Sequence, residues 1–212
     1  MTSSPHKLIP QSFSPIPSRT GGAPTELTAV AAVARDSAAV EAIGILVAPE
    51  GDLPAEVGYD RDGLARLGFE GKLGQSAVVP RAGVADLIVV GSGAADAQTA
   101  ASLRDLAGSF ARAAAKYSRI AIDLGDSFTA VDASDRARLV AEGLILGRYR
   151  YTPLKTDPKT VALLSVEIGV GPSASLDDAA DGIRLGTITA RAANLARDLA
   201  NTPPSHLTAT DF

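Results

Sequence analysis

The chain has 212 residues, of which 46% are hydrophobic and 4% aromatic, and its net charge at neutral pH is −4. It contains no cysteine and no apolar run of about 18 residues, so we expect neither a disulfide-stabilised secreted domain nor a membrane protein. The negative charge argues against a general nucleic-acid binder, and the length is sufficient for one well-buried core with an appendage.

The N-terminal segment, residues 1–26, is rich in Ser, Pro, Thr and Gly. It offers too little apolar surface to offset the entropy lost on ordering, so we predict a disordered tail. It has neither the apolar block of a signal peptide nor the repeated arginines of a transit peptide.

Strand and helix patterns then alternate over residues 27–172, which is typical of a three-layer α/β domain with a mixed sheet. Strands are predicted at 27–34, 43–48, 77–79, 86–91, 119–124 and 160–168. Helices are predicted at 60–69, 95–117 and 134–148, the last with Asp132 or Ser134 as its N-cap. Gly143 and Gly147 would allow the backbone of this last helix to approach the sheet closely.

The capping signals and apolar periodicity of residues 173–201 predict a long helix that links this domain to a further one. Ser175 and Asp178 form a capping box at its start, and Pro203 and Pro204 follow its end. One apolar stripe runs along it: Leu185, Ile188, Ala192, Leu195 and Leu199.

The stripe is expected to face a domain outside this segment, so that the helix frays when it stands alone. Gly182 and Gly186 should weaken the helix further, because glycine has a low helix propensity. Residues 208–211 then resemble the N-cap of another helix, so we expect 202–212 to be the start of a truncated domain.

Two motifs carry a family resemblance. Asn194-Leu195-Ala196-Arg197-Asp198-Leu199, followed by Asn201-Thr202-Pro203-Pro204-Ser205 and Leu207-Thr208, is similar to the NLAR-L-N-P-N-LTP signature of the leucyl aminopeptidases (cytosol aminopeptidases, peptidase family M17). Residues 141–147 with Tyr149, Tyr151 and Leu154-Lys155 resemble the AEG-x-x-LG-x-Y-x-Y-x-x-LK segment of that family. The resemblance is good from about Ser76 onward, and it departs from the family at His206, where a small Asn-x pair is usual.

The resemblance implies a macro-domain-like N-terminal domain followed by the helix that leads to the catalytic domain. The parent enzyme would release N-terminal amino acids, with leucine favoured, from peptides. It would use two divalent cations, Mn²⁺ or Zn²⁺, held in motifs similar to VGKGITFDSGG and NTDAEGRL. Neither motif occurs in this sequence, so no catalytic, cofactor-binding or metal residue is assigned here. The family also implies a cytoplasmic homohexamer, in which this segment would have a structural role.

A stand-alone DNA- or nucleotide-binding module is the alternative hypothesis. The Gly91-Ser92-Gly93-Ala94-Ala95-Asp96 stretch follows a strand, as a dinucleotide-binding turn would, but Asp96 would repel a pyrophosphate and a tight turn is the favoured interpretation. Six basic residues cluster in one region of the sequence: Arg136, Arg138, Arg148, Arg150, Lys155 and Lys159. We interpret them as an ordinary solvated face with partners such as Asp135, Glu142 and Asp157, since mixed charges dilute the field that DNA would need.

The acidic residues at the start of the long helix are a weaker candidate for a metal site. Asp177, Asp178 and Asp181 are explained by their favourable interaction with the helix dipole. His6 and His206 are too far apart in the sequence for an HExxH-type site, and no Ser/His/Asp set is available.

Overall fold

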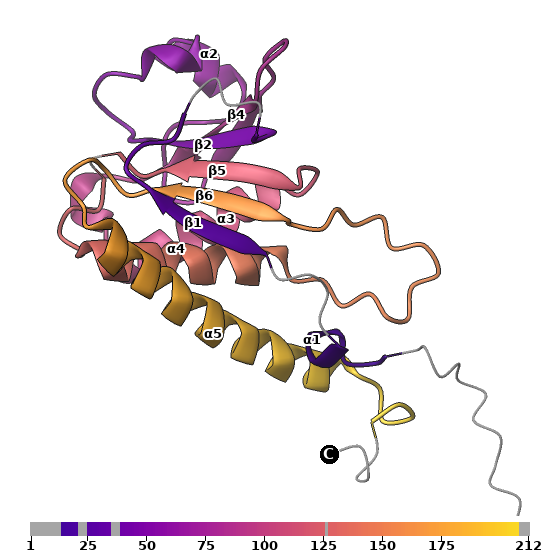
Figure 1. The fold of residues 1–212 in the computed structure, drawn as a ribbon. Helices are drawn as coiled ribbons and strands as arrows, with labels where there is room; N and C mark the ends of the chain where they lie inside the picture. The colour runs from indigo at the N-terminus through magenta and orange to yellow at the C-terminus, as the bar shows by residue number, and fades with distance from the viewer. Residues whose placement is uncertain (1–13, 21–24, 35–38, 126, 208–212) are drawn as a thin grey trace, which may run out of the picture.

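A computed structural model describes residues 14–20, 25–34, 39–125 and 127–207. A six-stranded sheet forms its centre, with strand order β1-β6-β5-β2-β4-β3 (Figure 1). All neighbouring strands are parallel except β3 and β4, which confirms the predicted mixed sheet. The strands are β1 Glu26–Val30, β2 Ala42–Val47, β3 Ser76–Val79, β4 Asp86–Gly91, β5 Arg119–Asp123 and β6 Ser165–Gly169.

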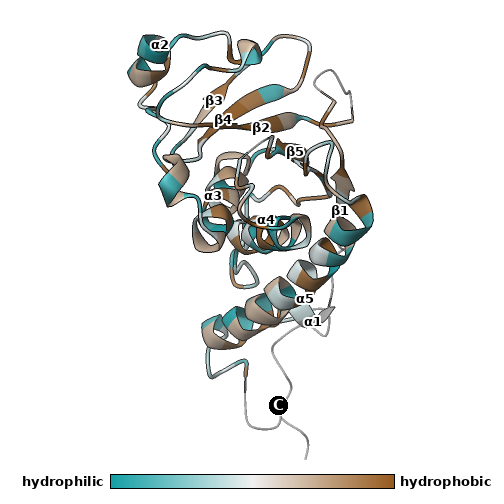
Figure 2. Ribbon diagram, turned by 90° about the vertical axis from the view of Figure 1, so that its left-hand side faces the viewer, coloured by the Kyte–Doolittle hydropathy of each residue, from teal (hydrophilic) through white to brown (hydrophobic). Residues whose placement is uncertain are grey.

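Helices lie on both sides of this sheet and complete the three-layer α/β architecture. The helices are α1 Pro17–Thr20, α2 Arg61–Arg66, α3 Ala100–Ala113, α4 Ala133–Arg148 and α5 Leu176–Asn201, with short 3₁₀ turns at Ala55–Val57 and Ala95–Ala97. Helices α3 and α4 cover one face of the sheet, and α2 lies on the opposite side (Figure 1). Helix α5 runs beneath α4 (Figure 2), and α1 lies beside the C-terminal end of α5 (Figure 1). None of the described helices combines the length and apolarity needed to cross a bilayer.

The main core lies between the sheet and the α3–α4 layer. Alternate residues of the central strands, such as Ile88 and Ile122, are fully buried there against Phe110 and Leu144. Gly44 in β2 leaves room for this packing, since a Cβ at that position would lie 2.7 Å from the ring of Phe110. The opposite face of the sheet buries two smaller clusters, one with Val33 and Val40 and one beneath α2 with Leu64 and Phe69.

Glycines bring α4 into backbone contact with α3. A Cβ on Gly143 would lie 2.3 Å from the carbonyl oxygen of Arg104, and one on Gly147 would lie 2.7 Å from that of Gly108. The prediction that Gly143 and Gly147 face the sheet is therefore wrong. They face the neighbouring helix, where the lack of a side chain lets the two backbones touch.

Helix α5 docks on its own domain through small residues. Cβ atoms on Gly182 and Gly186 would lie 2.1 Å from the Ser134 carbonyl oxygen and 2.3 Å from that of Arg138, both in α4. The buried positions of α5 are Ala179, Gly182, Ile183, Gly186, Ala190 and Asp198. The first part of the predicted apolar stripe lies on another face, where Leu185 is 44% and Ile188 55% exposed, whereas Leu195 and Leu199 are half-buried.

These contacts correct the expectation that Gly182 and Gly186 only weaken the helix. They form its contact surface with α4, and the packing compensates for their low helix propensity. The helix is therefore a layer of this domain, whatever it connects to beyond Asn201.

The predicted disordered tail is wrong for its described part. Residues 14–20 pack against the end of α5, where Ile16 is only 5% exposed and the Ser18 amide donates to Asp198 over 2.8 Å. Glu26, placed in the tail by the prediction, is the first residue of β1. Residues 1–13 and 21–24 lie outside the described part of the chain, as does the N-cap predicted at 208–211.

Several element boundaries depend on partners that the local sequence does not reveal. The strand predicted at 160–168 is β6 at Ser165–Gly169, where β1 and β5 pair with it from both sides. Helix α3 begins at Ala100 instead of at 95, because Thr99 and Ser102 form a capping box. Of the two N-caps proposed for α4, Asp132 is the one observed, and its side chain accepts from the Asp135 amide at 2.8 Å.

Glu41 connects the start of β2 to the start of β5 and should make stability depend on pH. Its Oε2 accepts from the Ser118 amide at 2.7 Å, the Ser118 hydroxyl at 2.8 Å and the Arg119 amide at 2.8 Å. The hydrogen bonds from the Arg119 amide and the Ser118 hydroxyl lower the pKa of Glu41, against a smaller opposing effect of burial. A carboxylate with a lowered pKa stabilises the fold above its unfolded pKa, and this contribution is lost as the pH falls through the folded pKa.

We therefore expect Glu41→Gln to lower the free energy of unfolding at pH 7 by about 1 kcal/mol, since the site is only partly buried. The deficit should shrink as the pH falls through the lowered pKa of folded Glu41, where the wild-type carboxylate also becomes protonated. Urea unfolding at pH 7 and at pH 3 measures both values, and Glu50→Gln at an exposed loop position controls for the loss of one charge. A deficit that is the same at both pH values would contradict this prediction.

Candidate functional site

The two family-like motifs meet at one place in the structure. The end of α4 and the residues just after it lie against the last turn of α5, at the lower edge of the molecule in Figure 1. We call this place the α4–α5 junction and define it by Tyr149, Tyr151, Arg197, Asp198, Asn201 and Thr202.

Tyr149 is at the centre of the junction. Its hydroxyl donates to Asp198 Oδ1 at 2.9 Å and accepts from Asn201 Nδ2 at 3.1 Å. The Arg197 guanidinium lies 5.4 Å from the centre of the Tyr149 ring and donates from Nη1 to the Leu146 carbonyl oxygen at 3.2 Å. Three residues of α5 thus hold the side chain that follows α4.

The electrostatics of the junction keep Tyr149 protonated. Burial raises the pKa of its phenol, and the hydrogen bond to Asp198 raises it further, while the hydrogen bond from Asn201 has the opposite effect. At neutral pH the hydroxyl therefore remains a donor to the carboxylate. Asp198 itself is only 1% exposed, so this donor compensates part of the cost of burying it.

Tyr151 and Thr202 extend the junction to the N-terminal segment. The Thr202 hydroxyl donates to the Asp198 carbonyl oxygen, which lies 2.6 Å away, at the C-cap of α5. The Tyr151 hydroxyl lies 3.2 Å from Thr202 Oγ1 and donates to the Pro15 carbonyl oxygen at 3.0 Å. The arrangement fixes the direction in which the chain leaves α5, and it contains no nucleophile paired with a base.

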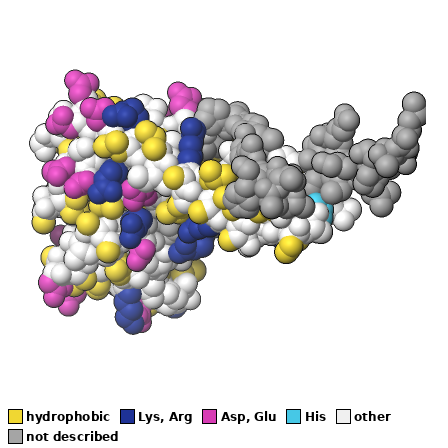
Figure 3. Space-filling model, turned by 90° about the horizontal axis from the view of Figure 1, so that it is seen from below, with side chains coloured by type: hydrophobic (Ala, Val, Ile, Leu, Met, Phe, Trp, Pro, Cys, Tyr) yellow, Lys and Arg dark blue, Asp and Glu magenta, His cyan; other side chains and the backbone are white. Residues whose placement is uncertain are grey.

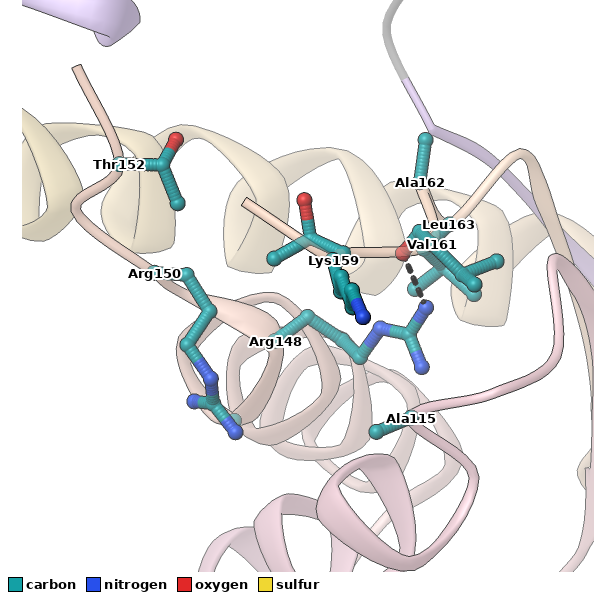
Figure 4. A pocket seen from close by; sticks show the side chains of 10 residues that line it. Ala115, Arg148, Arg150, Thr152, Lys159, Val161, Ala162 and Leu163 are labelled. Carbon is teal, nitrogen blue, oxygen red and sulfur yellow. Dashed lines mark hydrogen bonds between the residues drawn. The ribbon is translucent and has the colours of Figure 1, made fainter. Parts of the chain in front are cut away.

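A basic cleft of about 360 Å³ lies beside the C-terminal ends of α3 and α4. Arg148, Arg150 and Lys159 contribute its charged lining, and Arg148 points toward Val161 while Arg150 points away from it (Figure 4). Arg148 donates to the carbonyl oxygens of Ala114, Tyr117 and Val161 at 2.6, 3.1 and 2.7 Å. Its charge is thus used to cap α3 and to hold the 152–164 loop.

The other predicted basic residues also have internal roles or lie among acids. Arg138 pairs with Asp135 at 2.8 Å and with Glu142 at 3.1 Å, and Arg136 is buried. Lys and Arg side chains alternate with Asp and Glu over the helical side of the molecule (Figure 3). These contacts support the interpretation as an ordinary face, and they do not support the DNA-binding alternative.

The glycine-containing turn after β4 is filled by the protein's own backbone. The Gly93 amide donates to the Gly71 carbonyl oxygen at 3.1 Å, and the Gly91 amide donates to that of Gln75 at 2.8 Å. A Cβ on Gly91 would lie 1.9 Å from the Lys72 carbonyl oxygen, so this glycine is required by the packing of the 71–75 segment. The turn thus has a structural explanation, in which the amides of Gly91 and Gly93 already donate to the backbone of the 71–75 segment.

The acidic start of α5 also has a structural role. Ser175 Oγ accepts from the Asp178 amide at 3.2 Å, and Asp181 pairs with Arg184 at 3.5 Å. Among the described residues no group of three or more His, Cys, Asp or Glu is placed to hold a metal ion. His206 lies beside Ser205, whose hydroxyl is 2.9 Å from its Nδ1.

Comparison with known proteins decides the family. Residues 57–158 match the cytosol aminopeptidase family, N-terminal domain. This chain contains an N-terminal domain of the cytosol aminopeptidase family. A probable cytosol aminopeptidase of Nocardia farcinica is 35% identical over 162 residues, which cover 71% of this chain and 30% of that protein. One from Roseiflexus castenholzii is 43% identical over 74 residues, or 34% of this chain and 15% of that protein. The matched part of this chain thus covers less than a third of the length of these relatives.

Solved structures share the fold of this chain. The bottromycin maturation enzyme BotP in complex with Mn superposes with a TM-score of 0.64 at 31% identity, over 81% of this chain and 34% of that one. A tomato leucine aminopeptidase mutant shares the fold, with a TM-score of 0.69 at 20% identity, over 89% of this chain and 40% of that one.

Sequence reasoning located the junction motifs through the family resemblance but missed what their residues do. In the sequence analysis Asp198 appears only as one position of the family motif, and Ile16 falls within the predicted disordered tail. A carboxylate in the last turns of a helix, where it opposes the helix dipole, was the one local signal that Asp198 has a specific partner.

Proposed function

We propose that this chain is the N-terminal portion of a metal-dependent leucyl aminopeptidase, which releases N-terminal amino acids from peptides. The observation that carries the proposal is the family match at residues 57–158, together with the second signature at the end of α5. In this proposal the segment has no active site and contributes structure: residues 27–172 form most of the domain, 173–201 the helix that packs on it and leads out of it, and 202–212 the start of a catalytic domain.

The chemistry would belong to residues beyond this segment. Two divalent cations, Mn²⁺ or Zn²⁺, would activate a water and polarise the scissile carbonyl. The solved Mn complex of BotP supports the use of such a metal among similar proteins. The described residues of this chain offer no comparable ligand cluster, so we assign them no metal.

The junction supports the structural part of the proposal. Arg197, Asp198 and Asn201 hold the last turn of α5 against Tyr149, and thereby set where the following Pro203 begins. We propose that this fixed exit orients the domain on the outside of a cytoplasmic homohexamer.

The 212-residue chain should show no aminopeptidase activity, because its sequence lacks both metal-binding motifs. The assay uses a leucine anilide substrate with added Mn²⁺ or Zn²⁺. As a positive control, residues 1–201 are joined to the matching C-terminal part of the Nocardia farcinica relative, and this chimera should turn over the substrate. Turnover by the 212-residue chain that persists through independent purifications would place an active site in this segment and contradict the proposal.

A further inference from the structure

Residues Ser14–Ser18, here called the strap, contact the α4–α5 junction as a bound peptide would. The Ser18 amide donates to Asp198 Oδ2 at 2.8 Å, across 180 residues of sequence. At the other end of the strap, the Pro15 carbonyl oxygen accepts from the Tyr151 hydroxyl at 3.0 Å, and it lies 3.2 Å from the Thr202 hydroxyl, whose proton is directed to the Asp198 carbonyl oxygen. Both a main-chain donor and a main-chain acceptor of the strap are therefore matched by side chains of the junction.

Ile16 provides an apolar anchor between these two polar contacts. It is 5% exposed, whereas the neighbouring Ser18 is exposed and Pro15 and Pro17 are half-buried. Prolines on both sides of Ile16 restrict the backbone before it binds, which lowers the entropy lost on docking. An anchored apolar residue flanked by paired backbone groups is how extended peptides are recognised by protein surfaces.

The Asp198 carboxylate is the group in the junction that recognises the main-chain N–H of an occupant. Its Oδ1 accepts from the Tyr149 hydroxyl and its Oδ2 accepts from the Ser18 amide, at 2.9 and 2.8 Å. The side chain is 1% exposed, and a buried carboxylate is costly unless donors satisfy it. Because the strap covers Oδ2 and also donates to it, an occupant of this site must supply a main-chain N–H at the position of Ser18.

We infer that the α4–α5 junction is a binding site for a short extended peptide, and that the strap fills it in cis. The ligand class is an apolar, β-branched residue between two prolines, followed by a free main-chain N–H. When the strap of a chain is displaced, the site should accept the same sequence from a separate peptide. This inference is independent of the proposed enzymatic function.

The first test follows the Ser18 amide in the full chain by hydrogen exchange. Ile16→Asp removes the anchor and Asp198→Asn weakens the acceptor, so each should accelerate exchange at Ser18 by tenfold or more. Ile188→Asp makes the same change at an exposed position of α5 and should leave Ser18 unchanged. Amides of Leu87–Val90 in β4 should remain protected in every variant, which shows that the fold is intact. Equal exchange at Ser18 in wild type and Ile16→Asp would overturn the inference.

The second test adds the synthetic peptide Ser-Pro-Ile-Pro-Ser at millimolar concentration to the Ile16→Asp chain. Saturable NMR shifts at Asp198 and Thr202 are expected, and they should be about tenfold weaker in affinity when Asp198→Asn is added, a loss of about 1.4 kcal/mol. Wild type, whose site is already filled, and a peptide with Asp in place of Ile should give no saturable shifts. If the original peptide shifts no junction signal in Ile16→Asp, the contact is ordinary packing and the inference fails.

Discussion

Gly143→Ala should destabilise the protein by about 2 kcal/mol or more, although it adds a single methyl group to a helix. The new Cβ would lie 2.3 Å from the Arg104 carbonyl oxygen, 2.7 Å from Ala107 Cβ and 3.0 Å from the Gly108 nitrogen. Backbone atoms cannot rotate away as a side chain can, so α3 and α4 must separate and loosen the core between them. This cost outweighs the gain of about 1 kcal/mol in helix propensity.

Gly108→Ala is the matched control on the facing helix. Its Cβ would meet Arg112 Nη1 at 3.4 Å and the Gly143 carbonyl oxygen at 3.5 Å, which are ordinary contacts. We expect this variant to be neutral or more stable by up to about 1 kcal/mol. Urea unfolding followed by circular dichroism measures both variants, since the chain has no tryptophan to report by fluorescence. Similar midpoints for the two would show that the helices do not touch at Gly143.

Arg148→Gln should lower the free energy of unfolding by about 2–4 kcal/mol, because one guanidinium serves three carbonyl oxygens. Ala114 and Tyr117 end the turn after α3, while Val161 belongs to the long segment before β6. Burial lowers the pKa of Arg148, and the nearby charge of Arg150 lowers it further, so the structure holds this cation where it is partly desolvated. The carbonyl contacts compensate that cost, and glutamine is too short to reach them all.

Arg150→Gln tests whether charge alone explains the effect. Arg150 is exposed, and its one hydrogen bond to the described residues goes to the carbonyl oxygen of its neighbour Tyr149, at 2.9 Å. Its replacement should change stability by no more than about 0.5 kcal/mol. If the two variants unfold at the same urea concentration, the three carbonyl contacts of Arg148 contribute nothing measurable.

Local signals in the sequence were sufficient for most of the fold. The strand predicted at 86–91 has those bounds in the structure, because an uninterrupted apolar run identifies a strand that is buried on both faces. Ser175 is the predicted cap of α5, although the Asp178 side chain does not complete the predicted capping box, and Asp132 is one of the two caps predicted for α4. Such signals are readable in the sequence because a cap acts on amides within three residues of itself.

The contact face of α5 could not be predicted from hydrophobicity. A periodicity argument assigns the buried face to the largest apolar residues, here Leu185 and Ile188, and both are exposed. The face that packs on α4 is defined by Gly182 and Gly186, whose contribution is the close approach of two backbones. Small residues carry no hydrophobic signal, so this packing becomes visible only when both helices are placed.

For a related reason, the composition of the N-terminal segment could not predict its contact with the α4–α5 junction. A segment rich in Pro and Ser indicates disorder when its own residues are averaged, and one buried Ile16 hardly changes the average. The partner that orders it, Asp198, lies 180 residues away from Ser18. The family resemblance identified the Asp198 position, but it did not indicate what binds there.

The pairing of the chain's first elements with its last ones has a consequence for synthesis on the ribosome. In the described part of the chain, strand β1 pairs with β6 alone, from Glu26↔Ser165 to Val30↔Gly169, and the Ser18 amide donates to Asp198. At translation rates of about 5–20 residues per second, β1 emerges on the order of ten seconds before its partner exists. During that interval the nascent strand has unpaired backbone edges and no sheet to join, so it is the part of the chain most exposed to chaperones and to aggregation.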